Sequence, residues 1–430
     1  MIKILKYGQV SNREIFARES DGAQVEETVA QILSQVKSRG DQALYDYCEK
    51  FDQATLSCLE VSKEEFDQAF AAVDSRLPGV LERAAANIRA FHEKQRRNSF
   101  IVNEQPGVLM GQKIVPLDRV GLYVPGGTAS YPSSVLMNAI PAKIAGVKEI
   151  VMVTPSRKGI INPAILSAAK IAGIDRIFKV GGAQAIAALA YGTESIPAVD
   201  KIVGPGNAYV AEAKKQVFGK VAIDMIAGPS EILVVADNTC RPELVAADML
   251  SQAEHDKMAS AVLVTDSMEL AEQVQKQIEI QLQSLPREEI ARTSIEKNGK
   301  IIVADTLHAA VEIANEIAPE HLEICVDNPF DYLAEIRHAG SVFLGKNCPE
   351  ALGDYFAGPN HTLPTSGTAR FSSPLSVDDF VKKYQYTYFT EEALSRVAED
   401  VAAFAEAEGL SGHARSVTFR MDKGKGDSRL

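Results

Sequence analysis

The chain has 430 residues, of which 46% are apolar and 24% charged, and its formal net charge is −12. This length predicts two or three domains with the composition of a soluble globular protein. The negative charge argues against nucleic acid as the main partner, and the lack of 18 consecutive apolar residues argues against a membrane span. The first residues carry no signal-peptide pattern. The five cysteines include no C-x-x-C pair, which favours a reduced, cytoplasmic protein.

The first hundred residues contain apolar side chains at helical spacing. Val25, Val29, Ile32, Leu33 and Val36 recur every three or four residues, and residues 79–97 continue the same period. This pattern predicts that residues 25–100 are mostly helical.

From residue 113 short apolar runs alternate with helical segments. The predicted strands are residues 120–124, 149–153, 176–180 and 201–203. Helices are predicted at about residues 133–145, at 163–172 and 183–191, and after residue 207. Such βα alternation is typical of a parallel, doubly wound sheet.

A second set of strands follows, with helices filling the gaps between them. The predicted strands are residues 231–236, 261–265, 300–303 and 341–344. Beyond residue 375 the chain is predicted to be helical and acidic, without a strand set of its own. The sequence therefore predicts an α/β protein with two parallel sheets.

Glycine pairs follow three of the predicted strands, where open α/β sheets bind phosphate groups. They are Gly126-Gly127, Gly181-Gly182 and Gly204-x-Gly206. None matches G-x-G-x-x-G, so the motifs alone leave open either a dinucleotide site or ordinary turns before helices.

Two further motifs carry side chains that suit metal binding or proton transfer. Gln252 and His255 are three residues apart, so on a helix they share one face, although they could equally be polar residues at a frayed helix end. Glu320 and His321 follow Pro319, and a turn there would let both reach one pocket. A lone Glu-His pair is more often an exposed coincidence.

The remaining polar motifs lie nearer the C-terminus. Asp354 belongs to a Gly/Pro-rich stretch and by itself indicates a turn. The segment from Glu408 to His413 follows an acidic helix and is typical of a helix end capped by Gly409 or Gly412.

One continuous run links several of these motifs. Residues 223–231 read IDMIAGPSE, followed by an apolar strand and by a helix ending in residues 251–256, SQAEHD. This run resembles the signature of histidinol dehydrogenases, the zinc- and NAD-dependent enzymes of the last steps of histidine synthesis. The resemblance extends from about residue 20 to 420.

The resemblance implies an α/β fold of two incomplete, Rossmann-like parallel-sheet domains of the aldehyde-dehydrogenase-like kind. It also implies small helical N- and C-terminal segments and an intertwined homodimer. The expected division is an N-terminal segment, a discontinuous domain carrying most of the zinc site, an inserted NAD-binding domain, and a helical tail that reaches the partner subunit. Their respective bounds are residues 1–20, 21–116 with 232–375, 117–231, and 376–430.

The resemblance also assigns roles residue by residue for oxidation of L-histidinol to L-histidine with two NAD⁺. His321 is the expected base and Glu320 activates water. Zn²⁺ is held by Gln252, His255, Asp354 and His413, the last donated by the partner subunit together with Glu408. NAD⁺ contacts Tyr123, Gln184 and Asn207. The expected substrate-binding residues are Ser230, Gln252, His255, His321, Asp354, Glu408 and His413.

Two other functions compete with this interpretation. A cysteine-dependent aldehyde dehydrogenase would suit the strand–helix pattern of residues 119–155, but it needs a nucleophilic thiol. Cys240 and Cys325 are the plausible candidates, and neither has the surrounding motif. A two-domain small-molecule binding protein is the alternative without catalysis.

Overall fold

The computed structural model describes residues 1–11, 23–126 and 131–422, so Gly127 and residues 12–20 of the predicted N-terminal segment lie outside the described residues. The chain forms two compact units. Unit 1 consists of Met1–Arg96 with Leu117–Phe380, and unit 2 of Arg97–Pro116 with Val381–Leu430. Among the described residues, no helix combines the length and apolar content needed to cross a membrane. The predicted domain boundaries stay predictions.

The first sheet of unit 1 has five parallel strands in the order β6-β5-β4-β7-β8. Its strands are β4 (Arg119–Tyr123), β5 (Glu149–Val153), β6 (Arg176–Phe178), β7 (Lys201–Val203) and β8 (Ala222–Ile223). The connecting helices are α6 (Pro132–Ala145), α7 (Pro163–Ala172), α8 (Gly182–Tyr191) and α9 (Ala208–Val217). This pairing confirms the predicted parallel sheet. Its strands could be predicted because strands buried on both faces are apolar runs in the sequence.

The predicted helical character of the N-terminal region is confirmed, and four helices of this region cover the sheet. They are α2 (Ala23–Arg39), α3 (Asp41–Asp52), α4 (Lys63–Ala72) and α5 (Leu77–His92). Helix α2 packs on α8 and α9, whereas α4 and α5 pack on α7. Each face of the sheet therefore has its own apolar core, one including Ile88 of α5 and the other Leu33 of α2.

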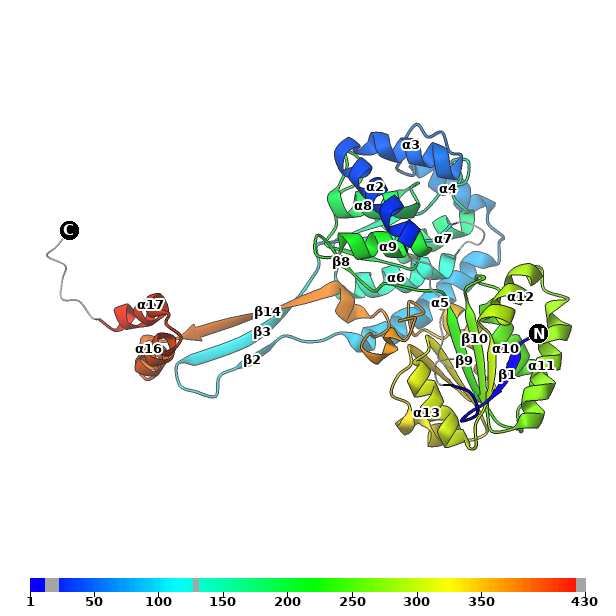
Figure 1. Cartoon of the computed structure of the whole chain (residues 1–430). Helices are drawn as coiled ribbons and strands as arrows, with labels where there is room; N and C mark the ends of the chain where they lie inside the picture. Colours follow the sequence, from blue (N-terminus) through cyan, green and yellow to red (C-terminus); the bar gives the residue numbers. More distant parts are fainter. Residues whose placement is uncertain (12–22, 127–130, 423–430) are drawn as a thin grey trace. The chain divides into compact units, whose positions relative to one another are not determined.

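The second sheet of unit 1 has six parallel strands in the order β1-β11-β10-β9-β12-β13. Its strands are β1 (Lys3–Lys6), β9 (Glu231–Ala236), β10 (Ser260–Thr265), β11 (Lys300–Val303), β12 (His321–Cys325) and β13 (Ser341–Leu344). One face packs on α10 (Pro242–Ala253), α11 (Met268–Leu282) and α12 (Glu288–Lys297), and the other on α13 (Leu307–Ile317) (Figure 1). The short helix α14 (Glu350–Tyr355) follows β13.

Unit 2 corrects the prediction that the chain beyond residue 375 forms no strands. Strand β14 (Val381–Phe389) pairs antiparallel with β3 (Val108–Pro116), which also pairs with β2 (Phe100–Val102). Aromatic residues alternate with polar ones in YQYTYF, the pattern of a strand with one apolar face. The pairing partner lies far away in the sequence, so a local reading did not reveal it.

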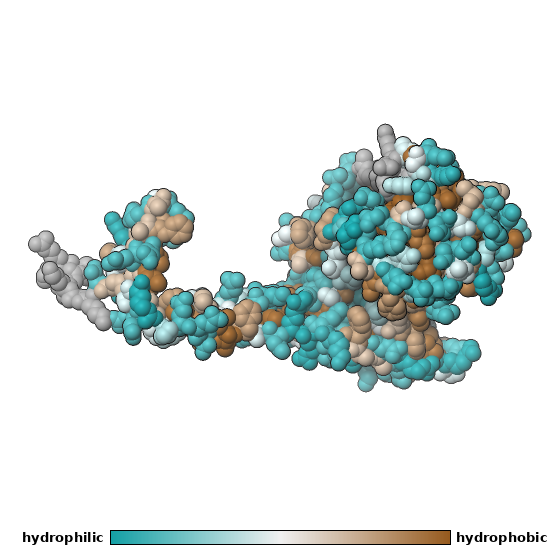
Figure 2. Space-filling view, turned by 90° about the horizontal axis from the view of Figure 1, so that it is seen from below, coloured by the Kyte–Doolittle hydropathy of each residue, from teal (hydrophilic) through white to brown (hydrophobic). Residues whose placement is uncertain are grey.

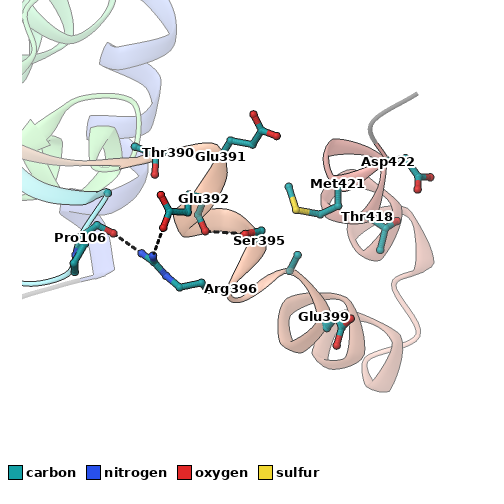
Figure 3. Close-up of a pocket in the computed structure, with 12 residues that line it drawn as sticks. Pro106, Thr390, Glu391, Glu392, Ser395, Arg396, Glu399, Thr418, Met421 and Asp422 are labelled. Carbon is teal, nitrogen blue, oxygen red and sulfur yellow. Dashed lines mark hydrogen bonds and ion pairs between the residues drawn. The ribbon is translucent and has the colours of Figure 1, made fainter. Parts of the chain in front are cut away.

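Three helices complete unit 2: α15 (Glu391–Ser395), α16 (Ala398–Ala407) and α17 (Ser411–Met421). Arg396, just after α15, donates to the backbone carbonyl of Pro106 and contacts Glu392 at 3.5 Å (Figure 3). These contacts attach the helices to the turn between β2 and β3. Beside them lies a hollow of about 910 Å³ lined by residues of unit 2, and it includes none of the predicted site residues.

Candidate active site

The predicted acid–imidazole pair lies at the amino end of two neighbouring strands of the six-stranded sheet. The turn predicted at Pro319 is present, since Ala318 ends α13 in a left-handed conformation with φ 51°. His321 is already the first residue of β12, which the sequence analysis did not predict as a strand. Both Glu320 and His321 are buried.

Both side chains bind the backbone of the same residue on the neighbouring strand β9. The Glu320 carboxylate accepts a hydrogen bond of 2.9 Å from the amide of Glu231. Nδ1 of His321 lies 2.9 Å from the carbonyl oxygen of Glu231. Because that carbonyl can only accept, Nδ1 carries the proton and Nε2 presents a lone pair.

The free ring nitrogen of His321 faces two carboxyl groups. Nε2 lies 3.9 Å from Glu350 Oε1 and 3.8 Å from Asp354 Oδ1, and it has no hydrogen-bond partner among the described residues. Burial lowers the pKa of His321 despite the charge of Glu350. The imidazole is therefore held neutral, the form that can accept a proton.

Asp354 lies at the end of α14, not in the turn that its neighbours indicated. Burial, and then the charge of Glu350, raise the pKa of Asp354 well above its usual range. His361 lies beside it, with Nδ1 3.0 Å from the Asp354 carbonyl and Nε2 3.2 Å from Ser134 Oγ. These contacts bring the loop after α14 against α6.

Glu350 is the residue at this site that the sequence analysis missed. Its Oε2 accepts a hydrogen bond of 3.1 Å from Ser251 Oγ, while Oε1 has no hydrogen-bond partner among the described residues. The spacing of four residues to Asp354 places the two acids on one helix face. That spacing was a usable signal, but no helix was predicted there.

Gln252 lies in the last turn of α10, whereas His255 lies just beyond the end of that helix, so the spacing does not place both on one helix face. The helix stops at Ala253, and the amide of His255 still bonds to the Gln252 carbonyl at 3.1 Å. Gln252 is 1% exposed, and neither of its side-chain polar atoms has a partner among the described residues. Burial lowers the pKa of His255, whereas Glu350 raises it, so the two side chains are within electrostatic reach.

This arrangement fits a metal ion. Ligand atoms of His321, Glu350 and Asp354 all lie within 4.8 Å of one another. Unpartnered buried atoms of Gln252 add a further oxygen, and a buried amide without a partner is costly unless something satisfies it. A donor set of nitrogen and oxygen without sulfur suits a borderline cation with room for a substrate.

The turn before β9 carries Ser230, one residue from the backbone that Glu320 and His321 bind. The Ser230 carbonyl accepts a hydrogen bond of 3.0 Å from the amide of Ser260 on β10. Earlier in the same turn, the Gly228 amide donates to Thr365 Oγ1 at 2.6 Å. Ser230 is thus placed next to the pair by contacts with two other segments.

The three candidate NAD⁺ residues lie at or just past the carboxyl ends of strands in the five-stranded sheet. Tyr123 ends β4, Gln184 is in the first turn of α8, and Asn207 caps α9. The Tyr123 hydroxyl accepts a hydrogen bond of 3.1 Å from the Gly182 amide, and burial raises its pKa to about 12. Asn207 Oδ1 already accepts from two amides of α9.

A buried ion pair that the sequence analysis missed fixes the Gly204 turn. Lys214 pairs with Asp224, and each side chain is 1% exposed. Nζ of Lys214 also donates to the Gly204 carbonyl at 3.0 Å. Asp224 accepts from the Gly204 amide at 2.8 Å. Gly204 has φ 112°, and a Cβ there would lie 2.1 Å from the Tyr123 carbonyl oxygen, so only glycine allows this approach.

Glu408 and His413 belong to unit 2, whereas the other candidate residues belong to unit 1. Glu408 follows α16, and Gly409 with φ 74° ends that helix as one of the two expected caps. Gly412 and His413 lie in the first turn of α17. Both Glu408 and His413 are exposed.

Comparison with solved structures first defines the class. The fold is similar to that of aldehyde dehydrogenase 21 from Physcomitrella patens, with 12% identity, a TM-score of 0.50 and 87% of each chain covered. The fold therefore defines an α/β protein with two parallel sheets, one of which carries the buried pair Glu320 and His321.

Sequence comparison then defines the family. Residues 16–421 match the histidinol dehydrogenase family. The chain is 58% identical to the histidinol dehydrogenase of Syntrophotalea carbinolica, over 92% of this chain and 93% of that one. It is 54% identical to that of Clostridium acetobutylicum, over 98% and 99%. The crystal structure of histidinol dehydrogenase from Elizabethkingia anophelis superposes with a TM-score of 0.93 at 40% identity, over 98% of both chains.

The chain therefore belongs to the histidinol dehydrogenase family, whose members are NAD-dependent oxidoreductases of histidine biosynthesis.

Proposed function

We propose that the protein oxidises L-histidinol to L-histidine through bound L-histidinaldehyde and reduces two NAD⁺. The observation that carries this proposal is the pairing of Glu320 and His321 on the backbone of Glu231. One base is needed for each alcohol or hydrate that loses a hydride, and a second group is needed to activate water. His321 and Glu320, which bind different backbone atoms of Glu231, can serve as these two groups.

His321 is the proposed base of both oxidations. Its Nδ1–H bond to Glu231 holds the ring so that Nε2 takes the hydroxyl proton while the carbon gives its hydride to NAD⁺. The aldehyde that results then needs water to form a hydrate before the second hydride can leave. Glu320 accepts the proton of that water, and burial raises its pKa, so the ionised carboxylate is a stronger base than an exposed one.

We propose that Gln252, His255 and Asp354, with His413 of a second copy, hold Zn²⁺. The unpartnered amide of Gln252 and the neutral imidazole favoured at His255 support this set. When bound, the ion would supply a Lewis acid that grips the substrate's imidazole and amino nitrogens. Ser230 and Glu408 are the further proposed substrate contacts. Glu350 is placed to orient Asp354 and His321.

For NAD⁺ we propose contacts with Tyr123, Gln184 and Asn207. Their position at or just past the carboxyl ends of β4, β6 and β7 supports this, because open parallel sheets bind ligands there. The Asn207 carbonyl oxygen is committed to the helix cap, so its amide NH₂ group is the part we assign to the cofactor.

We propose that the protein is a homodimer in which unit 2 donates Glu408 and His413 to the partner's site. Unit 2 exposes many large apolar side chains for its size, and hydrophobic surface is visible in Figure 2. Exposed in unit 2 are Phe100, Ile101, Met110, Tyr384, Tyr388, Phe389, Val401, Phe404, Leu410 and Phe419. Such a surface is typical of a protein interface, and in a symmetric dimer this surface of each copy would be buried.

The test is the stoichiometry of NADH formed per histidinol consumed, with and without added Zn²⁺. We expect roughly two NADH per histidinol, because the reaction removes four electrons. One NADH per histidinol would contradict the proposal. Thiol alkylation separates it from a cysteine-dependent dehydrogenase, which would be inactivated. Cys240 and Cys325 are both buried, and Cys240 Sγ donates to the backbone carbonyl of Cys325 at 2.5 Å. The contact with Cys240 and burial raise the pKa of Cys325, which disfavours a thiolate there, whereas the pKa of Cys240 is lowered.

A further inference from the structure

Three elements that carry candidate site residues converge on one buried acid, Glu323. It lies two residues after His321 on β12, so both side chains leave the same face of the sheet. Glu323 is 2% exposed, and none of the roles proposed above uses it. Its neighbours on this face are α10, which carries Gln252, and α14, which carries Asp354.

The contact with α14 is a hydrogen bond to the first residue of that helix. Glu323 Oε1 accepts from the Glu350 amide at 2.7 Å. Helix α14 has no cap of its own, because its N-cap residue is Pro349 and no side chain near it in sequence accepts this bond. A distant carboxyl group thus fixes the start of the helix. Asp354 follows four residues later on the same face as Glu350.

The contact with α10 is with Asp248, one turn before Gln252. Carboxyl oxygens of Asp248 and Glu323 lie within 4.8 Å of each other. Burial, and then the charge of Asp248, raise the pKa of Glu323 well above its usual range, while burial raises that of Asp248 to about 6. The raised pKa of Glu323 favours its protonated form between α10 and β12, where a second charge beside Asp248 would be costly.

A second bond closes the arrangement. Ser251, adjacent to Gln252 on α10, donates to Glu350 Oε2 at 3.1 Å. The first residue of α14 is thus held from β12 by its backbone and from α10 by its side chain. Loss of the Glu323 bond would free the backbone of α14 while leaving both sheets paired.

We propose that Glu323 is a positioning residue that holds α14 so that Glu350 and Asp354 face Nε2 of His321. This inference rests on the proposed function, in which Asp354 binds Zn²⁺. It assigns Glu323 no contact with substrate, cofactor or metal. Residues behind metal ligands commonly affect affinity 10- to 100-fold when they are replaced, on the order of what we expect here.

The test compares three variants of the full-length protein. Glu323→Leu removes the acceptor, whereas Glu323→Gln keeps an oxygen that can accept from the Glu350 amide. Asn315→Leu is the matched control: Asn315 is also 2% exposed, and its Oδ1 also accepts a backbone amide, that of Arg337, at 2.7 Å. Asn315 lies on α13, on the opposite face of the same sheet.

The measurements are Zn²⁺ affinity of metal-free protein, by competition with a chromogenic chelator, and kcat and the KM for NAD⁺. For Glu323→Leu we expect zinc affinity to fall at least about tenfold and kcat to fall with it, while the KM for NAD⁺ stays unchanged. Glu323→Gln should remain within about threefold of the unmodified protein, because the acceptor is retained. Asn315→Leu should lower the melting temperature and leave zinc affinity unchanged.

Unchanged zinc affinity in Glu323→Leu would overturn the proposal, and so would an equal loss in Glu323→Gln. If Glu323→Leu does not fold, Glu323→Asp replaces it, since a side chain shorter by one methylene withdraws the acceptor from the Glu350 amide. The same loss is then expected, and normal affinity overturns the proposal. Failure of the unmodified protein to bind zinc or oxidise histidinol would instead contradict the proposed function, which keeps the two failures distinct.

Discussion

Nδ1 of His321 lies 2.9 Å from the carbonyl oxygen of Glu231, so the backbone of one strand sets the tautomer of the imidazole on the next. Replacing His321 by Asn should leave a side chain that can still donate to this carbonyl but cannot take a proton. We expect kcat to fall about 10²- to 10⁴-fold for histidinol and for histidinaldehyde alike, since each oxidation must lose a proton. Single-turnover NADH formation from each substrate measures this. Loss with only one of them would contradict a shared base.

Glu320 makes a different prediction, because water enters only after the first hydride transfer. Glu320→Gln should slow oxidation of histidinaldehyde more than oxidation of histidinol. The amide oxygen of Gln can still accept from the Glu231 amide, so the fold around the site should persist. The two half-reactions are compared by single-turnover kinetics with excess enzyme. Equal slowing of both would rule out a specific role in water activation.

Removal of the metal is the third prediction. A chelator should abolish turnover, and Zn²⁺ should restore it, because the proposed ligands are nitrogen and oxygen donors without a thiolate. Far-UV circular dichroism should not change, since the cores of both sheets are apolar and do not contain these ligands. Elemental analysis is the control for metal content. A sample that is metal-free by this measure and fully active would refute the prediction.

Subunit complementation tests whether His413 serves the partner's site. His413→Ala and His255→Ala should each be inactive alone. After subunit exchange, a mixed dimer has one site that draws an intact His255 from one chain and an intact His413 from the other. Random mixing of equal amounts makes about half of the dimers mixed, so roughly a quarter of normal activity should return. If none returns although labelled subunits have exchanged, His413 does not act across the dimer.

Asp52 predicts a pH-dependent stability that is separate from catalysis. It ends α3, its Oδ2 is buried without a partner among the described residues, and burial raises its pKa to about 6 from 3.8. A carboxyl group with a raised folded-state pKa stabilises the fold below pH 3.8, and this contribution is lost as the pH rises through about 6. Asp52→Asn should therefore stabilise the protein at pH 7.5, by about 1–3 kcal/mol, and much less near pH 4. Denaturant unfolding at both pH values measures this, and an equal gain at both would contradict it.

Most strands of both parallel sheets could be predicted because they are buried on two faces. Residues 149–153, EIVMV, and 231–236, EILVVA, are almost uninterrupted apolar runs between turns. Strand β12 was not predicted, because it has His321 and Glu323 at positions where such a run would carry apolar residues. Helix α14 was not predicted, because it is only six residues long and contains Gly353. These buried positions carry polar residues at or next to the site, so the apolar pattern does not predict the elements that contain them.

The family signature identified the candidate residues, but the sequence could not predict which atoms these residues contact. Nothing local indicates that Glu320 and His321 both bind the backbone of Glu231, because that contact requires β9 and β12 to pair. The same is true of Lys214 and Asp224, whose ion pair closes around Gly204. Spacing in sequence selects side chains on one element, whereas these interactions depend on how separate elements meet.

Strand β3 pairs along its full length with β14, residue Val108 with Phe389 at one end and Pro116 with Val381 at the other. During synthesis β3 leaves the ribosome with β2 as its only available partner, and nearly all of unit 1 must be translated before β14 appears. Until then one edge of β3 offers unpaired amides and carbonyls to any other strand. We therefore expect completion of this sheet to be a late and slow step of folding, in which nascent chains are most vulnerable to aggregation.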